Sequence, residues 1–331
     1  MPKPRYAQVS LEATPYYHCF SRCVRRAFLC GLDGLTKISY EHRKQWLEDR
    51  VYTASTAFAL DLCTYAIMSN HYHVVLHVNK PQADAWDMDE IINRWHMLYK
   101  GNVLSQRYLK GETLGKAELA TLSEKAELWR EQLMDISWFM RFVNEGVARR
   151  ANAEDDCTGR FWEGRFSSQA LLDEAALAAC MVYVDLNPVR AGMAKTPEAS
   201  DHTSIRKRIQ SVLNIEPSDY QKLQPEGLYP FVGNPRIDMP DGLPFELSEY
   251  IELVDLTGRQ LREGGKGSID ASELPMLQRL GIENDNWKEL TRNFQEKTKG
   301  LVGSVFTLKI ACEKLGYQRM ICKQSCEQFF S

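Results

Sequence analysis

The two β-forming runs at residues 62–68 and 71–78 constrain the fold more than any other feature of this sequence. Both runs are rich in apolar and aromatic side chains, and only Ser69-Asn70 separates them. Serine and asparagine favour turns, and two strands joined by two such residues are typical of a β-hairpin. The sequence therefore predicts a sheet in which these two strands are antiparallel neighbours.

Further strands and helices are predicted on both sides of the hairpin. Residues 16–22 and a stretch within residues 161–172 have the composition of strands. Apolar residues at helical spacing predict helices at 39–60, 86–101, 116–134 and 136–153, and one more that runs to about residue 184. The order strand, helix, strand, strand, helices, strand, helix predicts an α+β fold with one mainly antiparallel sheet and helices on one face.

The length of 331 residues allows two domains, and the chain turns polar at Lys195-Thr196-Pro197. We expect a first domain at 1–198, with a helical insertion at about 105–135, and a mainly helical accessory domain at 199–331. The helices of the second domain are predicted at 204–214, 246–263, 271–281, 284–298 and 303–315. The basic run Arg206-Lys207-Arg208 would suit an accessory domain that binds DNA or a partner.

The composition is that of a globular protein, with 44% hydrophobic and 26% charged residues. No apolar run approaches the ~18 residues that a membrane span requires. The basic N-terminus lacks the apolar core of a signal peptide. The nine cysteines include two pairs spaced C-x3-C, Cys19/Cys23 and Cys322/Cys326, which is not the spacing of a zinc site. Free thiols in a reducing cytoplasm are therefore expected.

The net charge of −3 lacks the basic excess that is usual for a protein that binds nucleic acid. Basic residues nevertheless gather locally, at 3–5, 22–26, 149–150, 160–165 and 206–208. Local patches can bind phosphate even when the total charge is slightly negative. The alternative for each cluster is a solvated face of mixed charge.

The triplet His71-Tyr72-His73 begins the second strand of the hairpin. Residues i and i+2 of a strand point to the same face, about 6–7 Å apart at the backbone, so the two imidazoles could bind one metal ion. Tyr72 should point into the opposite layer. The alternative is a pair of histidines that are merely exposed or hydrogen-bonded. His77 shares their face but lies roughly 13 Å further along, too far to share the ion, and is expected to be non-catalytic.

Two histidines leave a metal ion incompletely coordinated. Asn152, Glu145 and Gln169 are the polar candidates for a third ligand within this region. In a phosphodiester reaction a divalent ion would polarise the scissile phosphate, and a nearby nucleophile would attack it.

Four segments in order carry a family resemblance, which covers roughly residues 5–195. They are Tyr17-His18-Cys19-Phe20-Ser21-Arg22, Ala66-Ile67-Met68-Ser69-Asn70-His71-Tyr72-His73-Val74-Val75-Leu76, Gly159-Arg160-Phe161-Trp162-Glu163-Gly164-Arg165-Phe166, and Tyr183-Val184-Asp185-Leu186-Asn187-Pro188-Val189-Arg190-Ala191-Gly192. Together they resemble the HUH-type single-strand DNA transposases, most closely the REP-associated tyrosine transposases.

The resemblance implies a ferredoxin-like (RRM-like) α+β domain that cuts and rejoins single-stranded DNA near hairpins with Mg2+ or Mn2+. It implies that His71 and His73 are the metal ligands and that Asn152 lies near the third. It also implies a tyrosine on a late helix that becomes linked to the 5′-phosphate.

The sequence departs from the family at that tyrosine. Its expected place, four to six residues before Asn152, is occupied by Gly146-Val147-Ala148, and residues 109–182 contain no tyrosine. Three interpretations stay open. Tyr183 could substitute as nucleophile, although its position also suits a core role. Water could attack instead, or the domain could bind DNA without cutting it.

Several basic and aromatic residues are candidates for DNA contact. Arg160 and Arg165 flank Phe161-Trp162, which suits phosphate contact and base stacking, and the alternative is a strand edge packed by Trp162. Arg190 is expected to satisfy carbonyl groups in a turn. The full set of candidate DNA-binding residues is Lys3, Arg5, Arg22, Arg25, Arg26, Arg149, Arg150, Arg160, Trp162 and Arg165.

The sequence thus predicts a transposase-like protein of the cytoplasm, associated with the nucleoid, that binds structured single-stranded DNA as a monomer or homodimer. Metal-dependent DNA strand cleavage and joining is the activity that the resemblance implies. One alternative is a non-catalytic DNA-binding regulator that retains the HUH fold. The other is an RNA-binding module that uses the RRM-like sheet.

Overall fold

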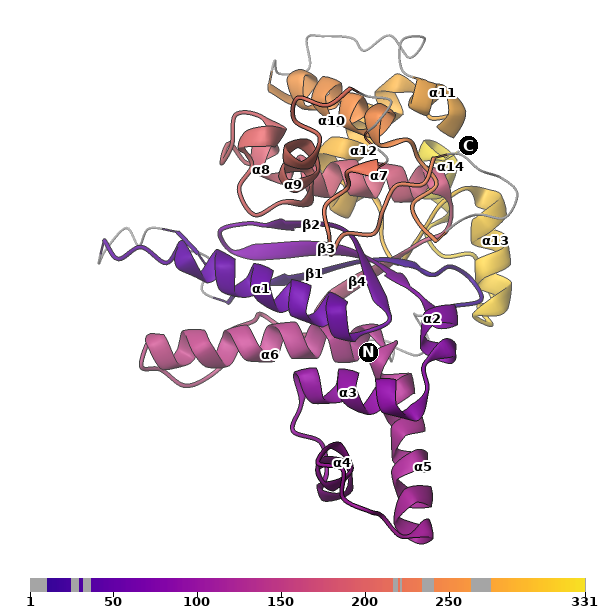
Figure 1. The fold of residues 1–331 in the computed structure, drawn as a ribbon. Coiled ribbons are helices and arrows are strands. Elements are labelled where there is room, and N and C mark those ends of the chain that lie inside the picture. Colours follow the sequence, from indigo (N-terminus) through magenta and orange to yellow (C-terminus); the bar gives the residue numbers. More distant parts are fainter. Residues whose placement is uncertain are drawn as a thin grey trace.

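A computed structural model describes residues 11–24, 30–31, 37–216, 220, 222–233, 241–262 and 275–330 (Figure 1). The strands are β1 (Tyr16–Arg22), β2 (Leu60–Ile67), β3 (His71–Val78), β4 (Ser167–Leu171) and β5 (Leu301–Val302). The helices before β4 are α1 (His42–Ala57), α2 (Lys80–Ala85), α3 (Met88–Leu98), α4 (Val103–Leu109), α5 (Lys116–Leu133) and α6 (Ile136–Glu154). The later helices are α7 (Glu174–Asp185), α8 (Asn187–Arg190), the 3-10 helix η2 (Pro197–Ala199), α9 (Ser204–Ser211), α10 (Leu247–Arg262), α11 (Pro275–Leu280), α12 (Asn284–Lys297), α13 (Val305–Lys314) and α14 (Lys323–Phe329).

The five strands form one sheet in the order β2-β3-β1-β4-β5. The predicted hairpin is confirmed: β2 and β3 are antiparallel, with an irregularity between Leu62 and Thr64. β1 pairs antiparallel with both β3 and β4, so the first four strands and helices α1 and α6 follow a βαββαβ order. β5 pairs parallel with β4, which makes the sheet mixed.

Helices cover both faces of the sheet, so the prediction of helices on one face is wrong. Tyr17, Cys19 and Tyr72 belong to the core cluster that includes α1 and α6. Val75 points to the other face and belongs to a second cluster built around α7. Figure 1 shows α1 and α6 on one side of the sheet and α7, α10 and α12 on the other. Both sets of alternating strand residues are apolar, so each face buries a layer.

Helix α7 lies at the centre of the second layer. All of its residues from Ala176 to Asp185 are buried, because it packs against β2 and β3 on one side and against α12 on the other. A helix that is apolar all round belongs in a core rather than at a surface. Residues beyond 199 therefore complete this layer through α12, which packs on α7, and extend the sheet through strand β5.

The carboxylate of Asp185 ties this second layer together. It accepts hydrogen bonds from Thr64 (2.8 Å) on β2, from Ser204 (2.6 Å) and the backbone N–H of Ile205 (3.2 Å) on α9, and from Tyr250 (2.5 Å) on α10. A fully buried carboxylate needs such donors in place of water. Asp185 of α7 thus joins strand β2 to helices α9 and α10.

Helices α3, α4 and α5 lie between β3 and α6 in sequence and extend away from the sheet (Figure 1). Trp95 of α3 stacks on Trp129 of α5, with ring centroids 4.9 Å apart. Among the described residues, no helix is long and apolar enough to cross a membrane.

Candidate metal and nucleic-acid site

His71 and His73 lie on β3, on the same face of the sheet, as the alternation of a strand requires. Their ring centroids are 4.9 Å apart. Tyr72 points to the other face, where its hydroxyl donates to Oδ1 of Asn144 on α6 at 2.8 Å. The pair therefore projects into the layer that α7 and α12 form, and not into the layer of α6.

A third imidazole, His18 of β1, completes a hydrogen-bonded relay to His73. Nε2 of Gln169 donates to the carbonyl of Thr298 (2.6 Å), which turns Oε1 of Gln169 toward His18. An amide oxygen only accepts, so Nδ1 of His18 carries the proton of that 2.8 Å bond. Nε2 of His18 must then accept from Nδ1 of His73 (3.0 Å). The relay leaves the lone pair of His73 on Nε2.

That Nε2 is a buried atom without a hydrogen-bond partner among the described residues. The neighbouring His71 is fixed in the same way, because its Nδ1 donates to Oδ1 of Asn70 at 2.5 Å and leaves the lone pair on Nε2. Histidines that bind a metal usually donate their other ring N–H to a fixed acceptor. Both imidazoles are thus held in the form that a metal ion requires.

The surroundings of the pair also keep the rings neutral. Burial, and then the charges of Arg22 and Arg190, lower the pKa of His71 to about 4. Burial is the main cause that lowers the pKa of His73 well below its usual value, and His71, His18 and the two arginines add to it. Burial also lowers the pKa of His18 to about 4, against a hydrogen bond to Gln169 that raises it. Neutral imidazole is the ligand form of histidine.

Two guanidinium groups give this end of the sheet a positive potential. Arg22 is exposed and lies directly opposite His71 in the β1–β3 pairing. Within the described part of the chain it has no ion-pair partner. Arg190 donates to Oδ1 of Asn187 (2.6 Å) and to the carbonyl of Arg292 on α12 (2.5 Å), so the carbonyl that it bonds belongs to a distant helix and not to the turn that the sequence suggested. Two cations beside neutral imidazoles favour an anion such as a phosphate.

Tyr183 lies against the same histidines. Its ring meets that of His73 edge-on, with centroids 5.8 Å apart, and the guanidinium of Arg190 lies 4.3 Å from its ring centre. The side chain is buried, with 3% of its surface exposed. Burial raises the pKa of Tyr183, and Arg190 offsets only part of that rise. The position suits both interpretations made from the sequence, a nucleophile and a core residue.

Side chains of helix α12 pack against the residues around His73. Phe294 packs against Tyr183 and His18, with centroids 5.6 and 6.2 Å away, and the amide nitrogen of Gln295 lies 3.4 Å from Nδ1 of His73. His73 consequently has none of its surface exposed, whereas His71 at the end of the strand is partly exposed. His71 is therefore accessible from solvent, whereas His73 is enclosed by side chains of β1, α7 and α12.

The three candidates for a third metal ligand lie in different places. Gln169 is in the relay but contacts His18 and not the pair. Glu145 forms ion pairs with Arg141 and Arg149 on α6. Asn152, also on α6, donates to the carbonyl of Gly159 at 3.1 Å. Helix α6 covers the face of the sheet opposite to His71 and His73. The role of Asn152 as the third metal ligand stays a prediction.

The segment 159–166 runs beside the end of β1. The N–H of Glu163 donates to the carbonyl of Arg22, and the N–H of Val24 donates to that of Phe161, both at 2.9 Å. Arg160, Phe161, Trp162, Gly164 and Arg165 line an open pocket of about 440 Å³ here. The indole N–H of Trp162 donates to the carbonyl of Asn144 at 2.8 Å, so the ring is partly built into the core.

Both arginines of this pocket are exposed, and neither has an ion-pair partner in the part of the chain that the structure describes. Arg149 instead pairs with Glu145, and Arg150 lies 3.7 Å from the ring centre of Trp46. The remaining candidates for DNA contact, Lys3, Arg5, Arg25 and Arg26, lie outside the described residues.

A second group of metal-ligating side chains lies at the far end of β3. Asp61, His77 and Asp241 place one ligand atom each within 4.8 Å of one another, and they are the one such trio of His, Cys, Asp or Glu among the described residues. Nδ1 of His77 bonds Asp61 at 2.8 Å, and the amide of Asn79 donates to both carboxylates. This trio is separate from His71 and His73.

Sequence reasoning did not identify His18, Gln295 or the Asp61–His77–Asp241 trio. The period of two along β1 places His18 and Arg22 on one face, which is a signal that was present in the sequence. The pairing of His18 with His73 depends on strand register, and the contact of Gln295 depends on tertiary packing.

No protein-family model matches the sequence, and no curated protein matches it. Among solved structures, the chain is similar to a REP-associated tyrosine transposase bound to a REP hairpin. The identity is 11%, the alignment covers 73% of this chain and 97% of that chain, and the TM-score is 0.38. That protein is of the family that the four sequence segments resemble.

Proposed function

We propose that this chain is a transposase-like protein that binds structured single-stranded DNA at the end of the sheet that carries His71 and His73. The observation that carries the proposal is the fixed pair of imidazoles, each with its lone pair on Nε2, beside the guanidinium of Arg22, which has no ion-pair partner among the described residues. The guanidinium group next to the neutral imidazoles favours an anionic phosphodiester over a metal cation that binds by itself.

The pocket at 159–166 supplies the second part of the DNA interface. Its backbone is hydrogen-bonded to the end of β1, next to Arg22, and the proposal has Arg160, Arg165 and Arg22 contact the same strand. Arginines bind phosphates along a strand, and the faces of aromatic rings accept stacked bases. We propose that the strand runs from this pocket to His71.

A divalent metal ion would be held by Nε2 of His71 and Nε2 of His73. Imidazole nitrogen favours Mn2+ over Mg2+, which prefers oxygen ligands. When bound, the ion would polarise the phosphate that lies on it. The relay through His18 and Gln169 would keep the ring of His73 in place, and Arg22 would neutralise the charge of the phosphate.

Cleavage of the bound strand is the finer part of the proposal. Tyr183 lies beside His73 and is the candidate nucleophile, with Arg190 next to its ring. Because α12 buries both rings, DNA would have to displace Phe294 and Gln295 before the hydroxyl could attack. The alternative is a DNA-binding regulator that does not cut, and the burial of His73 and Tyr183 favours it.

One assay separates these functions. Labelled hairpin-flanked single-stranded DNA is incubated with the protein, with Mn2+ or EDTA, and is resolved on native and denaturing gels. A covalent adduct that Tyr183→Phe abolishes supports the nucleophile, and cut DNA without adduct supports water. Binding without any cut supports the regulator. Tighter binding of a matched RNA hairpin would contradict the preference for DNA.

The metal assignment has its own test, because the chain carries two groups of ligands. Mn2+ binding is measured by electron paramagnetic resonance on wild type, on the His71→Ala/His73→Ala variant and on His77→Ala as the matched control. We expect the double variant to lose the DNA-stimulated Mn2+ signal and His77→Ala to keep it. The reverse pattern would move the ion to the trio at Asp61.

A further inference from the structure

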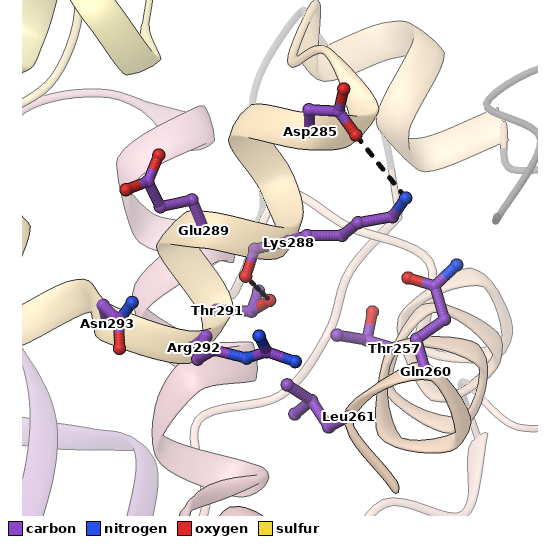
Figure 2. A pocket seen from close by; sticks show the side chains of 9 residues that line it. All are labelled: Thr257, Gln260, Leu261, Asp285, Lys288, Glu289, Thr291, Arg292 and Asn293. Atoms are coloured by element: carbon purple, nitrogen blue, oxygen red, sulfur yellow. Dashed lines mark hydrogen bonds and ion pairs between the residues drawn. The ribbon is translucent and has the colours of Figure 1, made fainter. Parts of the chain in front are cut away.

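A pocket of about 430 Å³ lies between α10 and α12, apart from the histidine pair. Figure 2 shows its lining, which comes from both helices. The residues are Thr257, Gln260, Leu261, Asp285, Lys288, Glu289, Thr291, Arg292 and Asn293. Its volume is within the range of sites that bind small molecules.

The side chain of Gln260 is the first indication that the pocket holds a ligand. It is buried, with 8% of its surface exposed, and neither its amide oxygen nor its amide nitrogen has a hydrogen-bond partner among the described residues. Buried amide groups in native proteins are nearly always bonded, and an exception calls for a partner. Gln260 thus presents one donor and one acceptor, side by side, to the pocket.

The hydroxyls of the two threonines in the lining are already satisfied. The hydroxyl of Thr257 accepts from the indole of Trp287 (3.0 Å) and donates to the carbonyl of Leu253 (2.6 Å). The hydroxyl of Thr291 donates to the carbonyl of Trp287 at 2.9 Å. Gln260 is therefore the lining residue whose buried polar atoms have no partner among the described residues.

Among the charged residues of the lining, Arg292 has no ion-pair partner within the described residues. Asp285 pairs with Lys288 at 3.5 Å, and Glu289 pairs with Lys297 at 2.5 Å. No ion pair of the described residues involves the guanidinium of Arg292, which extends across the pocket toward α10 in Figure 2. A free guanidinium favours a carboxylate or phosphate, which it binds with two parallel hydrogen bonds.

We propose that this pocket binds a phosphorylated nucleoside, with its base on Gln260 and its phosphate on Arg292. A glutamine amide matches the neighbouring donor and acceptor on a base edge, as it does with adenine. Leu261 gives the ring an apolar wall, and Arg292 is the lining cation that is left for the phosphate. The nucleotide is either free or part of a DNA strand, since the recognised chemistry is the same.

The backbone carbonyl of Arg292 links the pocket to the surroundings of the histidine pair. The carbonyl of Arg292 accepts from Arg190, and Phe294 and Gln295 follow two and three residues later on the same helix. The backbone at Asn293, between them, is non-helical. A ligand on the guanidinium of Arg292 therefore lies within one turn of the residues that cover His73.

Isothermal titration calorimetry on the full chain tests the proposal, with dAMP, deoxyadenosine, inorganic phosphate and a short single strand of deoxyadenylates as separate titrants. We expect dAMP to bind more tightly than deoxyadenosine or phosphate. Gln260→Leu, which keeps the volume but removes the amide, and Arg292→Ala should each weaken the dAMP affinity at least tenfold. The matched control Arg259→Ala, on the same helix but outside the lining, should leave it unchanged.

The other arms identify the source of the nucleotide. If the strand binds and dAMP does not, and both pocket variants weaken the strand, the nucleotide belongs to DNA and the proposal holds. If no titrant binds, or if neither variant weakens binding while circular dichroism shows each one folded, the proposal is overturned. Binding of dAMP that the pocket variants weaken would stand even if the hairpin assay showed no DNA binding, so a failure of the proposed DNA-processing function would not be mistaken for a failure here.

Discussion

Removing the two exposed arginines of the pocket at 159–166 should change how DNA affinity depends on salt. Arg160 and Arg165 are exposed, line the same pocket and have no ion-pair partner among the described residues. Each is placed to neutralise one phosphate. The Arg160→Ala/Arg165→Ala variant therefore loses two phosphate contacts without removing a buried group.

The size of the effect follows from counterion release. Each phosphate contact on a single strand contributes about 0.7 to the slope of log affinity against log salt, so two contacts contribute about 1.4. Between 50 and 200 mM salt, wild type should then lose about sevenfold more affinity than the variant. The variant should also bind more weakly at the lower salt concentration.

Fluorescence anisotropy with a labelled hairpin-flanked single strand, at four salt concentrations, measures both slopes. The control is Lys110→Ala/Lys116→Ala, which removes the same charge from two exposed residues around the α4–α5 connection. Its slope should match that of wild type. Equal slopes for wild type and the arginine variant would refute the assignment of this pocket to phosphate.

Two further predictions concern the stability of the frame that holds the site. Burial raises the pKa of Glu48, but hydrogen bonds with His202 and Tyr65 and the charge of Lys207 outweigh it and lower the pKa to about 2 from 4.5. Glu48 therefore stabilises the fold above pH 4.5, by about 1–3 kcal/mol after allowance for solvent screening, and loses this as the pH falls from 4.5 to 2. Urea unfolding of Glu48→Gln should show a deficit at pH 7 that shrinks toward pH 3, and a constant deficit would contradict it. Asp185→Asn should lower the free energy of unfolding by about 3 kcal/mol, because an amide cannot accept from all four donors; a change below ~0.5 kcal/mol would show that this network does not join the layers.

The sequence was sufficient to predict the hairpin, because strand alternation and turn chemistry are local. The same alternation places His71 and His73 together and Tyr72 on the other face. The long helices α1, α5 and α6 also follow from apolar spacing, and their ends differ from the predicted ones by a few residues at most.

Features that depend on distant partners could not be predicted in this way. Strand β5 has two residues and exists only because Leu301 and Val302 meet β4. The relay from Thr298 through Gln169 and His18 to His73 joins four segments, and its register is not encoded in any one of them. The cover that α12 places over the histidines is likewise a result of packing.

Hydrogen exchange of the protein with and without a hairpin-flanked single strand tests the central claim most directly, because it locates the DNA on the chain. The account predicts that DNA slows exchange at the end of β1, at residues 69–73 and at segment 159–166. Because DNA must displace α12 to reach His73, exchange at residues 292–298 should become faster. Protection confined to other regions, or no change at saturating DNA, would contradict a nucleic-acid site at His71 and His73.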